Sequence, residues 1–549
     1  MLGGHAVART LKEAGCNVVF TLCGGHVAPI YDGCVEFGIA VVDTRHEQAA
    51  VHAADAHARL TRGLGVAILT AGPGVTDGVT GIANAQFANS PVLIIGGAPK
   101  QSQMGRGTLQ EMDQLALVRP ICKGVFTVTN PDRLSETIAQ AAQLALSGIP
   151  GPVFVEIPFD VVAASTEVLQ LHQASFRALP QAADAGTIEE LAAILAKSER
   201  PVIFAGSAVW WDDAGSAVEA LAARGIPVLS NGMARGVLPH DHASALALAR
   251  GKALRECDAL VLVGAPLDFR LGYGKEINAS ANIVAIDRDA RVFGKNRACT
   301  LALHADARSA LRALDGALSR RSFDEGRVAA WRESLRAEEH TRMQPMIAWA
   351  ADESGPVNHF RLAKAIADIS DMDPERETIV IGDGGDVVSM AARMIRPRKM
   401  GLWLDPGPFG TLGVGAPFAL AAKHLRPDAH VVLLSGDGSF GLTGFDIETC
   451  VRFNLPVTVV VGNDAAWGQI RVPQITAFGE ARAVGSSLAP IRYDHVVKAF
   501  GGEGEHVASG AELDAAMLRA RTANKVYCLD VALDRTFIQK NKLSKFTVL

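Results

Sequence analysis

Short runs of β-branched and apolar residues alternate with alanine-rich stretches of helical character along almost the whole chain. Runs of the first kind include residues 18–22, 40–45, 65–71, 91–97 and 152–157. Strands that are apolar along their whole length and alternate with helices are typical of parallel sheets covered by helices on both faces. The alternation therefore predicts an α/β protein built from doubly wound parallel sheets.

The alternation falls into three blocks, at residues 1–165, 185–330 and 355–535, with a short tail at 536–549. Residues 165–185 interrupt the pattern and are expected to be a linker. The charged stretch at 319–342 is expected to be a solvated helix. A chain of 549 residues is long enough for about three or four domains of roughly 150 residues each. We therefore expect three similar α/β domains.

Composition and charge exclude several classes of protein. Hydrophobic residues make up 49% of the chain and charged residues 20%, which is typical of a well-buried enzyme and not of a disordered chain. The formal net charge of -5 argues against nucleic acid as the main partner. We expect no membrane span and no signal peptide, because no sufficiently long apolar run is present. The eight cysteines form no Cys-x-x-Cys pair, which favours a cytoplasmic protein with reduced thiols and no zinc site.

The third block places an aspartate just after each of two consecutive apolar runs. Asp437 lies between Gly436 and Gly438, and Asp464 follows Asn463 after the next run. A crossover helix between two parallel strands brings their carboxyl ends to one edge of the sheet, where ligands bind. Mg²⁺ combines one or two carboxylates with substrate phosphates, and the glycines and the following helix start suit a phosphate. The residues predict a magnesium-bridged diphosphate site; the alternative is two ordinary turns.

The same stretch resembles the diphosphate-binding motif of thiamine-diphosphate-dependent enzymes, which runs from Gly-Asp-Gly to Asn-Asn. The second Asn of the motif is Asp464 in this chain, a change that keeps an oxygen ligand and adds negative charge. The resemblance implies thiamine diphosphate and Mg²⁺ as cofactors, with Asp437, Asp464 and the backbone carbonyl of Ala466 as metal ligands. The motif residues implied to bind the cofactor are Gly436, Gly438, Ser439, Asp464, Ala466 and Trp467.

A carboxylate in the first block lies at a strand-to-helix turn. Glu47 follows the run at 40–45 and precedes an alanine-rich stretch, and a buried carboxyl has a raised pKa that suits proton sharing. In the resembling family a glutamate contacts the pyrimidine ring of the cofactor, and the resemblance implies this activating role for Glu47. The alternative is a solvated glutamate that complements the helix dipole. His46, His52 and His57 lack the spacing of a zinc-binding helix and are expected to be packing or surface residues.

Two further glycine-rich stretches resemble parts of the same cofactor site. Leu412, preceded by Gly410 and Thr411, matches the large apolar side chain that supports the bent cofactor in the family. The alternative is an ordinary core leucine. Gly385 and Asp386, in the stretch 379–388, match positions that border the diphosphate or the thiazolium ring.

The resemblance covers nearly the whole chain and favours one branch of the family. Stretches such as "VDTRHEQAA", "DGGDVV" and "VVGNDAAWGQI" look most like the acetolactate-synthase-like group that includes 2-hydroxyacyl-CoA lyases. Benzaldehyde lyase is similar around His26 and Gln110, which match polar residues above the reacting carbon. The resemblance implies that His26 and Gln110 hydrogen-bond the substrate oxygen and move protons. The alternatives are a histidine at a helix start and a loop glutamine.

This branch implies a carbon–carbon lyase that cleaves a 2-hydroxyacyl-CoA to formyl-CoA and an aldehyde or ketone, with the reverse condensation also available. The alternatives are an acetolactate synthase or a benzaldehyde-lyase-type carboligase acting on 2-oxo acids or acyloins, and a simple decarboxylase. A non-catalytic binding or regulatory subunit would lack Glu47, Asp437 or Asp464, and all three are present. In relatives the glutamate and the metal come from different subunits, which implies a homodimer or homotetramer with active sites between chains.

Two regions leave further ligands open. The second block has a crevice-like pattern around Arg270 and Asp287, where relatives hold FAD, ADP or nothing, and no Gly-x-Gly-x-x-Gly follows a strand there. The C-terminal tail is expected to be either a lid whose cations meet CoA phosphates or a frayed end. The cations of this tail are Arg535, Lys540, Lys542 and Lys545.

Overall fold

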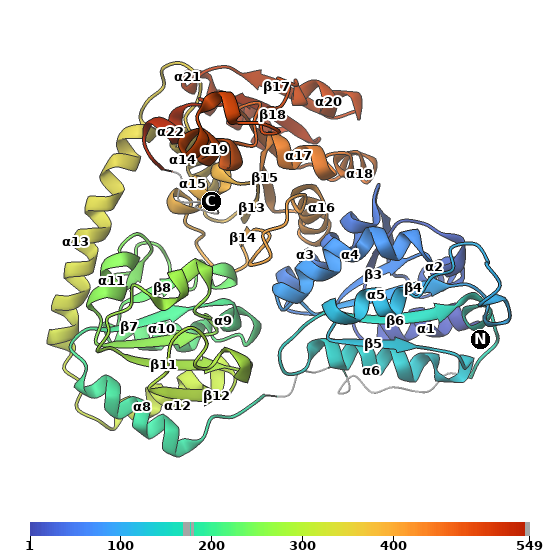
Figure 1. Ribbon diagram of the computed structural model, residues 1–549, viewed down its shortest axis with the longest axis horizontal. Helices are drawn as coiled ribbons and strands as arrows, with labels where there is room; N and C mark the ends of the chain where they lie inside the picture. The colour runs from blue at the N-terminus through green and yellow to red at the C-terminus, as the bar shows by residue number, and fades with distance from the viewer. Residues whose placement is uncertain (168–175, 177–179, 544–549) are drawn as a thin grey trace.

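The computed structural model describes residues 1–167, 176 and 180–543. Its strands form three six-stranded sheets, one after another along the chain, with helices on both faces of each sheet (Figure 1). The named strands pair in parallel throughout, as at β15 with β16 and β3 with β4. This confirms the predicted α/β class with three doubly wound parallel sheets. Most of the linker predicted at 165–185 lies outside the described residues.

The N-terminal sheet has the strand order β2-β1-β3-β4-β6-β5. Its central strands are buried along their whole length, which is why they form continuous apolar runs in the sequence. The edge strand β5 does not form such an apolar run, because none of its residues is fully buried. The strands are β1 (Val18–Thr21), β2 (Ala40–Asp43), β3 (Gly65–Leu69), β4 (Val92–Ala98), β5 (Gly124–Thr127) and β6 (Val153–Pro158). The main helices are α1 (Gly3–Glu13), α2 (Ala28–Glu36), α3 (Glu47–Thr61), α4 (Pro73–Phe87) and α6 (Leu134–Leu146).

The central sheet has the order β12-β11-β10-β7-β8-β9 and its own hydrophobic core. Its strands are β7 (Pro201–Ala205), β8 (Val228–Ser230), β9 (Ala245–Leu246), β10 (Ala259–Val263), β11 (Asn282–Asp287) and β12 (Leu301–His304). The covering helices include α8 (Ala185–Lys197), α10 (Gly215–Ala223) and α12 (Ala307–Ser319).

A long helix, α13 (Glu325–Ala350), runs along the outside of the molecule from the central domain to the C-terminal domain (Figure 1). The expectation of a fully solvated helix is wrong for one of its faces. Trp331 and Leu335 are buried there, and so is Glu339. The Glu339 carboxylate accepts hydrogen bonds from the three successive backbone N–H groups of residues 247–249 and pairs with Arg396. The helix therefore links the central and C-terminal domains through a buried carboxylate whose two oxygens both accept hydrogen bonds.

The C-terminal sheet has the order β14-β13-β15-β16-β18-β17. The crossover between β15 and β16, expected as one helix, consists of two helices separated at Gly444 and Phe445, where a glycine weakens helical continuity. The strands are β13 (Thr378–Asp383), β14 (Trp403–Leu404), β15 (His430–Gly436), β16 (Thr458–Asn463), β17 (Glu503–Val507) and β18 (Tyr527–Ala532). The helices include α14 (His359–Asp371), α15 (Asp386–Met394), α16 (Gly415–Leu425), α17 (Asp437–Thr443), α18 (Asp446–Arg452), α19 (Gly468–Phe478), α21 (Gly510–Thr522) and α22 (Phe537–Lys540).

The N-terminal and C-terminal domains share one hydrophobic cluster within the chain. Helix α3 packs against α16 (Figure 1), and both helices present buried alanines, which let two helices approach closely. None of the helices in the described part of the chain has the length and apolar character that crossing a bilayer would require.

The start of the predicted C-terminal tail is packed and not free. Phe537 and Ile538 of α22 are buried in a cluster with Phe360 and Met346. The packed structure therefore extends beyond residue 536 to about the end of α22. Lys545 lies outside the described residues.

Candidate functional site

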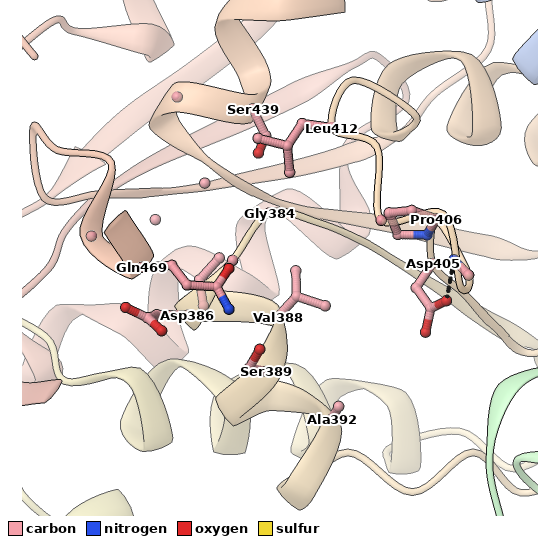
Figure 2. Close-up of a pocket in the computed structure, with 18 of the residues that line it drawn as sticks. Gly384, Asp386, Val388, Ser389, Ala392, Asp405, Pro406, Leu412, Ser439 and Gln469 are labelled. Carbon is pink, nitrogen blue, oxygen red and sulfur yellow. Dashed lines mark hydrogen bonds between the residues drawn. The ribbon is translucent and has the colours of Figure 1, made fainter. Parts of the chain in front are cut away.

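The carboxyl ends of β13, β15 and β16 lie side by side at one edge of the C-terminal sheet. Asp383 is in register with Ser435, and Gly436 is in register with Gly462. Residues that follow these strands therefore converge, and a cavity of about 600 Å³ opens there (Figure 2). It is lined by eleven of the residues that the sequence suggested for the cofactor and metal: Gly385, Asp386, Gly410, Leu412, Gly436, Asp437, Gly438, Ser439, Asp464, Ala466 and Trp467. Thr411 is not among the lining residues.

Two aspartates in this cavity lie near each other and have raised pKa values. Asp437 is only 2% exposed, and the Gly438 N–H donates to its Oδ1 at 2.9 Å. Its Oδ2 is buried and has no hydrogen-bond partner among the described residues. Burial, and then the nearby Asp464, raise the pKa of Asp437 to about 7. Burial raises the pKa of Asp464 to about 6. Such a pair fits a bound cation, which would favour both ionised carboxylates.

The donor set suits Mg²⁺ better than a metal held by the protein alone. Within the described ranges no three His, Cys, Asp or Glu side chains are grouped as a metal centre. Mg²⁺ needs only one or two carboxylates when phosphates and waters complete its octahedron. Ala465, in the left-handed conformation at φ 51°, turns the chain between Asp464 and the buried Ala466. The residues present therefore fit the predicted magnesium site.

The two glycines of the Gly-Asp-Gly stretch have different roles. A Cβ atom at Gly436 would have its nearest neighbour, Val387, at 3.8 Å, so space remains there for a ligand. A Cβ atom at Gly438 would lie 2.6 Å from the ring of Trp467. Gly438 is therefore needed for packing against Trp467, and not only for the approach of a phosphate as the sequence suggested.

A third aspartate, Asp383, positions the turn that carries Leu412. It is 1% exposed, and its carboxylate accepts hydrogen bonds from the N–H groups of Gly413 at 3.1 Å and Gly415 at 2.8 Å. Burial raises the pKa of Asp383 to about 6. Figure 2 shows Leu412 beside Ser439, reaching into the cavity. The sequence reasoning missed Asp383, although an aspartate that ends a buried strand is itself a signal.

The N-terminal domain of the same chain contributes Arg59 to the cavity wall. Its guanidinium forms a buried pair with Asp55, with Nε 2.8 Å from Oδ1. It also donates to the backbone carbonyls of Asp405 at 2.7 Å and Pro406 at 3.3 Å. Arg59 therefore fixes the start of the loop that leads to Leu412.

Glu47 and His26 lie in the N-terminal domain at the carboxyl ends of its strands. Glu47 is the first residue of α3 and is buried, and burial raises its pKa. His26 is half-buried, and its Nδ1 lies 3.3 Å from Oγ1 of Thr70, which follows β3. Burial lowers the pKa of His26. Burial thus favours the protonated, neutral carboxyl of Glu47 and the unprotonated, neutral imidazole of His26.

Gln110 lies against the same turn after β3. A Cβ atom at Gly72 would lie 2.6 Å from the Gln110 carbonyl oxygen, and one at Gly74 would lie 3.4 Å from Oε1 of Glu47. Gln110 has a left-handed backbone, with φ 62°. The buried Gln114 fixes this arrangement, because its side chain accepts from the Gly72 N–H at 3.2 Å. The structure therefore brings Glu47, His26 and Gln110 to one region, the turn at residues 70–74.

The predicted site residues form two groups that do not share a cavity within one chain. Glu47, His26 and Gln110 are absent from the wall of the 600 Å³ cavity, to which the N-terminal domain contributes Arg59 and Ala88. His52 and His57 are packing residues as expected, and burial lowers the pKa of each to about 4. His46 accepts from the Gln48 N–H at the start of α3.

The two residues proposed for a central nucleotide crevice are not brought together. Arg270 lines the cavity of about 600 Å³ and is paired with Asp268, its Nε lying 3.0 Å from Oδ2. Asp287 ends β11 and lines a separate cavity of only about 10 Å³. Ligand sites usually measure roughly 300–1,000 Å³. The space beside Asp287 is therefore smaller than a usual ligand site, whereas Arg270 and the central-domain residue Ser207 line the 600 Å³ cavity.

Comparison with known sequences agrees with this geometry. Residues 1–117 match the N-terminal TPP binding domain of thiamine pyrophosphate enzymes, residues 188–314 their central domain and residues 383–531 their C-terminal TPP binding domain. The two terminal matches contain the two groups of site residues described above. The chain is therefore similar to this family in all three of its domains.

Relatives span nearly the whole chain. The "Probable acetolactate synthase" of Mycobacterium bovis is 40% identical over 540 residues, which cover 97% of this chain and 96% of the relative. The "2-hydroxyacyl-CoA lyase 2" of Danio rerio is 35% identical over 591 residues, covering 99% and 93%. That of Homo sapiens is 37% identical over 549 residues, covering 91% and 84%. The chain belongs to the thiamine pyrophosphate enzyme family and is a thiamine-diphosphate-dependent enzyme.

Proposed function

We propose that the protein is a carbon–carbon lyase that cleaves a 2-hydroxyacyl-CoA to formyl-CoA and an aldehyde or ketone. The observation that carries the proposal is His26, a histidine whose pKa is lowered by burial and which lies in the same group as Glu47. Cleavage of such a substrate requires that the 2-hydroxyl lose its proton as the C1–C2 bond breaks. A neutral imidazole at pH 7 is able to accept that proton.

The C-terminal cavity holds the cofactor in this proposal. Thiamine diphosphate, when bound, supplies a nucleophilic carbon and accepts the electron pair of the breaking bond. Asp437, Asp464 and the Ala466 carbonyl would hold Mg²⁺, and Leu412 would support the cofactor. The unpartnered buried Oδ2 of Asp437 supports this metal assignment. Glu47, with its raised pKa, holds a proton that it would share with the pyrimidine ring of the bound cofactor.

The chain's polar residues account for the protons of the reaction. His26 takes the proton of the 2-hydroxyl, and the hydroxyl-bearing carbon leaves as an aldehyde or ketone. Gln110 donates a hydrogen bond to the substrate oxygen. Return of one proton to C1 gives formyl-CoA, so substrate and products balance without an oxidant or reductant. The same residues serve the reverse condensation.

The complete site lies between two copies of the chain, in a homodimer or in a homotetramer. The N-terminal group of one copy, with Glu47, His26 and Gln110, faces the C-terminal cavity of the other copy. Support comes from the separation of the two groups within one chain, since none of these three residues lines the cavity. A lone chain would therefore be inactive.

The second candidate is an acetolactate synthase or another carboligase acting on 2-oxo acids or acyloins. It is favoured by the 40% identity to the acetolactate synthase of Mycobacterium bovis. The synthase reading goes with FAD in the central domain. The absorbance spectrum of the purified protein separates the two, since bound flavin would make the protein yellow.

The cations near the C-terminus support a CoA substrate. The Arg535 guanidinium donates to Oγ of Ser487 at 3.0 Å, and its charge acts to lower the pKa of Asp464, so it lies near the cofactor cavity. Because Phe537 and Ile538 are buried, a deletion that tests the lid must begin after α22. Removing residues 541–549 is expected to raise the KM for acyl-CoA and leave the KM for benzoin unchanged; equal effects on both would contradict a lid.

The eight free cysteines fit a cytoplasmic location.

A substrate panel tests the proposed reaction. The protein, supplied with thiamine diphosphate and Mg²⁺, is offered 2-hydroxyacyl-CoAs, benzoin and pyruvate, and the products are identified by mass spectrometry. We expect formyl-CoA together with an aldehyde or ketone. Acetolactate from pyruvate with the CoA esters untouched would place the chain in the synthase branch.

A further inference from the structure

A second sizeable cavity, of about 450 Å³, lies at the opposite edge of the C-terminal sheet from the cofactor cavity. Its wall includes His430 and Thr458, the first residues of β15 and β16. The same two strands lead at their other ends to Asp437 and Asp464. The cavity is therefore separate from the site described above, and the proposed reaction gives it no role. We call it the basal cavity.

The wall of the basal cavity carries four cationic side chains and one acidic side chain: Arg376, Lys423, Arg521, Lys525 and Asp428. Two of the cations have no carboxylate partner in the described part of the chain. Arg376 donates through Nε to the Asp428 carbonyl at 3.1 Å. Lys423 is buried and donates to the carbonyls of Pro427 and Ala429, each at 2.7 Å. Both therefore bring positive charge that no ion pair neutralises.

The other two cations are only loosely paired. Arg521 is buried, and its Nη2 lies 3.8 Å from Asp373; Lys525 lies 3.7 Å from Glu503. Both distances exceed a hydrogen bond, and the side chains of Asp373 and Glu503 are 45% and 53% exposed. An ion pair between a cation and a solvated acid at such a distance is weak. The positive charge of each of the four cations is therefore only partly neutralised.

Two helix ends add a smaller negative contribution. Helices α16 and α21 end beside the basal cavity, and a helix C-terminus carries about half of a negative elementary charge. Together with the exposed Asp428 they offset roughly two of the four positive charges. A net positive charge therefore remains.

The cations also disfavour one another's charge. Burial, and then Arg376, lower the pKa values of Lys423 and Arg521. Burial, followed by Arg521, Arg376 and Lys423, lowers the pKa of His430 to about 3, so its ring is neutral. His430 lies 3.0 Å from Oγ1 of Thr458 and 3.3 Å from Nη1 of Arg521, an arrangement that fixes the guanidinium. An anion in the cavity would relieve this repulsion.

We propose that the basal cavity binds a small multivalent oxyanion of the phosphate class. Guanidinium and ammonium groups that converge in a partly desolvated cavity match the geometry and charge of phosphate oxygens. Among the residues that the structure describes, no Phe, Tyr or Trp side chain lines the cavity, so a nucleobase would find no aromatic ring there to stack on. The chemistry therefore favours inorganic phosphate over a nucleotide.

Calorimetric titration of the holoprotein tests the proposal. The protein is first saturated with thiamine diphosphate and Mg²⁺ so that the cofactor cavity is filled. It is then titrated with inorganic phosphate against a chloride blank of equal ionic strength, and separately with AMP. Saturable binding of phosphate, with AMP no tighter, is the expected result. No heat beyond the chloride blank, or much tighter binding of AMP, would overturn the proposal.

Matched variants locate the binding site. Arg376→Gln removes a cation of the cavity wall, whereas Arg426→Gln removes an exposed cation outside the wall that lies 3.8 Å from Glu377. We expect Arg376→Gln to weaken phosphate binding about fivefold or more and Arg426→Gln to change it less than about twofold. Equal binding by Arg376→Gln and the unmodified protein would overturn the proposal. Lys525→Gln, at a more exposed wall position, serves as a second variant if Arg376→Gln does not fold, with the same expected direction.

Discussion

At the scale of single residues, the proposed metal site is governed by the protonation of two buried aspartates. The pKa values of Asp437, about 7, and Asp464, about 6, lie above the ordinary value of 3.8. A raised carboxyl pKa favours the folded metal-free protein at low pH, and this contribution is lost as the pH rises from about 4 to about 7. Mg²⁺ at this proposed site would require both carboxylates ionised, so it would restore stability where the metal-free protein has lost it.

The first prediction is that stabilisation by Mg²⁺ increases with pH. The rise in Tm on adding Mg²⁺ should be small at about pH 5.5 and larger at about pH 8, because protons compete with the metal below the pKa values of the two aspartates. Differential scanning fluorimetry at several pH values measures it. An Asp437→Asn variant should lose most of the increase. A rise in Tm that is independent of pH in the unmodified protein would contradict the metal assignment.

The second prediction concerns the buried carboxyl of Glu47. Glu47→Gln should lower kcat by about 10²–10⁴-fold, because an amide cannot exchange a proton with the cofactor. Thiamine diphosphate should still bind, since the proposed diphosphate and metal contacts lie in the other domain. Glu36→Gln, an exposed glutamate of α2, is the control and should retain full activity. Turnover by Glu47→Gln at the unmodified rate would refute the activating role.

At the scale of elements, the turn after β13 depends on one buried side chain. The Asp383 carboxylate accepts from the backbone N–H groups of Gly413 and Gly415, and so fixes the residues that directly follow Leu412. Gly410 and Gly413 have φ values of 69° and 88°, which glycine adopts without strain. The position of Leu412 is therefore set from the strand end and not by the turn alone.

The third prediction follows from this support. Asp383→Asn replaces an acceptor oxygen with an N–H₂ group that faces backbone N–H groups, so we expect a lower Tm and an apparent affinity for thiamine diphosphate weaker by about tenfold or more. Titration of the cofactor, followed by tryptophan fluorescence, gives the affinity. Asp371→Asn removes a surface partner of Arg398 and serves as control. Cofactor binding unchanged by Asp383→Asn would show that the turn holds its shape without this contact.

The strands that could be predicted from the sequence are those whose residues are buried along almost the whole strand. Strands β3, β4, β13, β15 and β16 are buried along almost all of their length and appear as apolar runs. Edge strands β5 and β17 carry exposed residues, so they lack that signal. The buried face of α13 was also hidden, because its charged residues include Glu339, whose partners lie far away in the chain.

At the scale of the whole molecule, sequence motifs indicate candidate site residues but not which of them lie together. The Gly-Asp-Gly and Asn-Asp stretches were found because strand ends in a parallel sheet share an edge. The role of Arg59 could not be found this way, because it depends on how α3 packs beside the loop at Asp405. Likewise Arg270 and Asp287, close in the linear pattern of the central domain, line different cavities.

The separation of Glu47 from the cavity of its own chain leads to the central claim, that active sites form between copies. The direct test mixes two inactive chains, Glu47→Gln and Asp437→Ala, under conditions in which subunits exchange. In a mixed dimer one site carries both substitutions and the other carries none. Random assembly should therefore restore about a quarter of the activity of the unmodified protein.

Mass spectrometry of intact assemblies confirms that mixed dimers have formed, and formyl-CoA release or benzoin cleavage reports their activity. Restored activity, rising with the fraction of mixed dimers, is the predicted result. Mixed dimers that stay inactive would contradict the account, because they would show that Glu47 and Asp437 must come from the same chain.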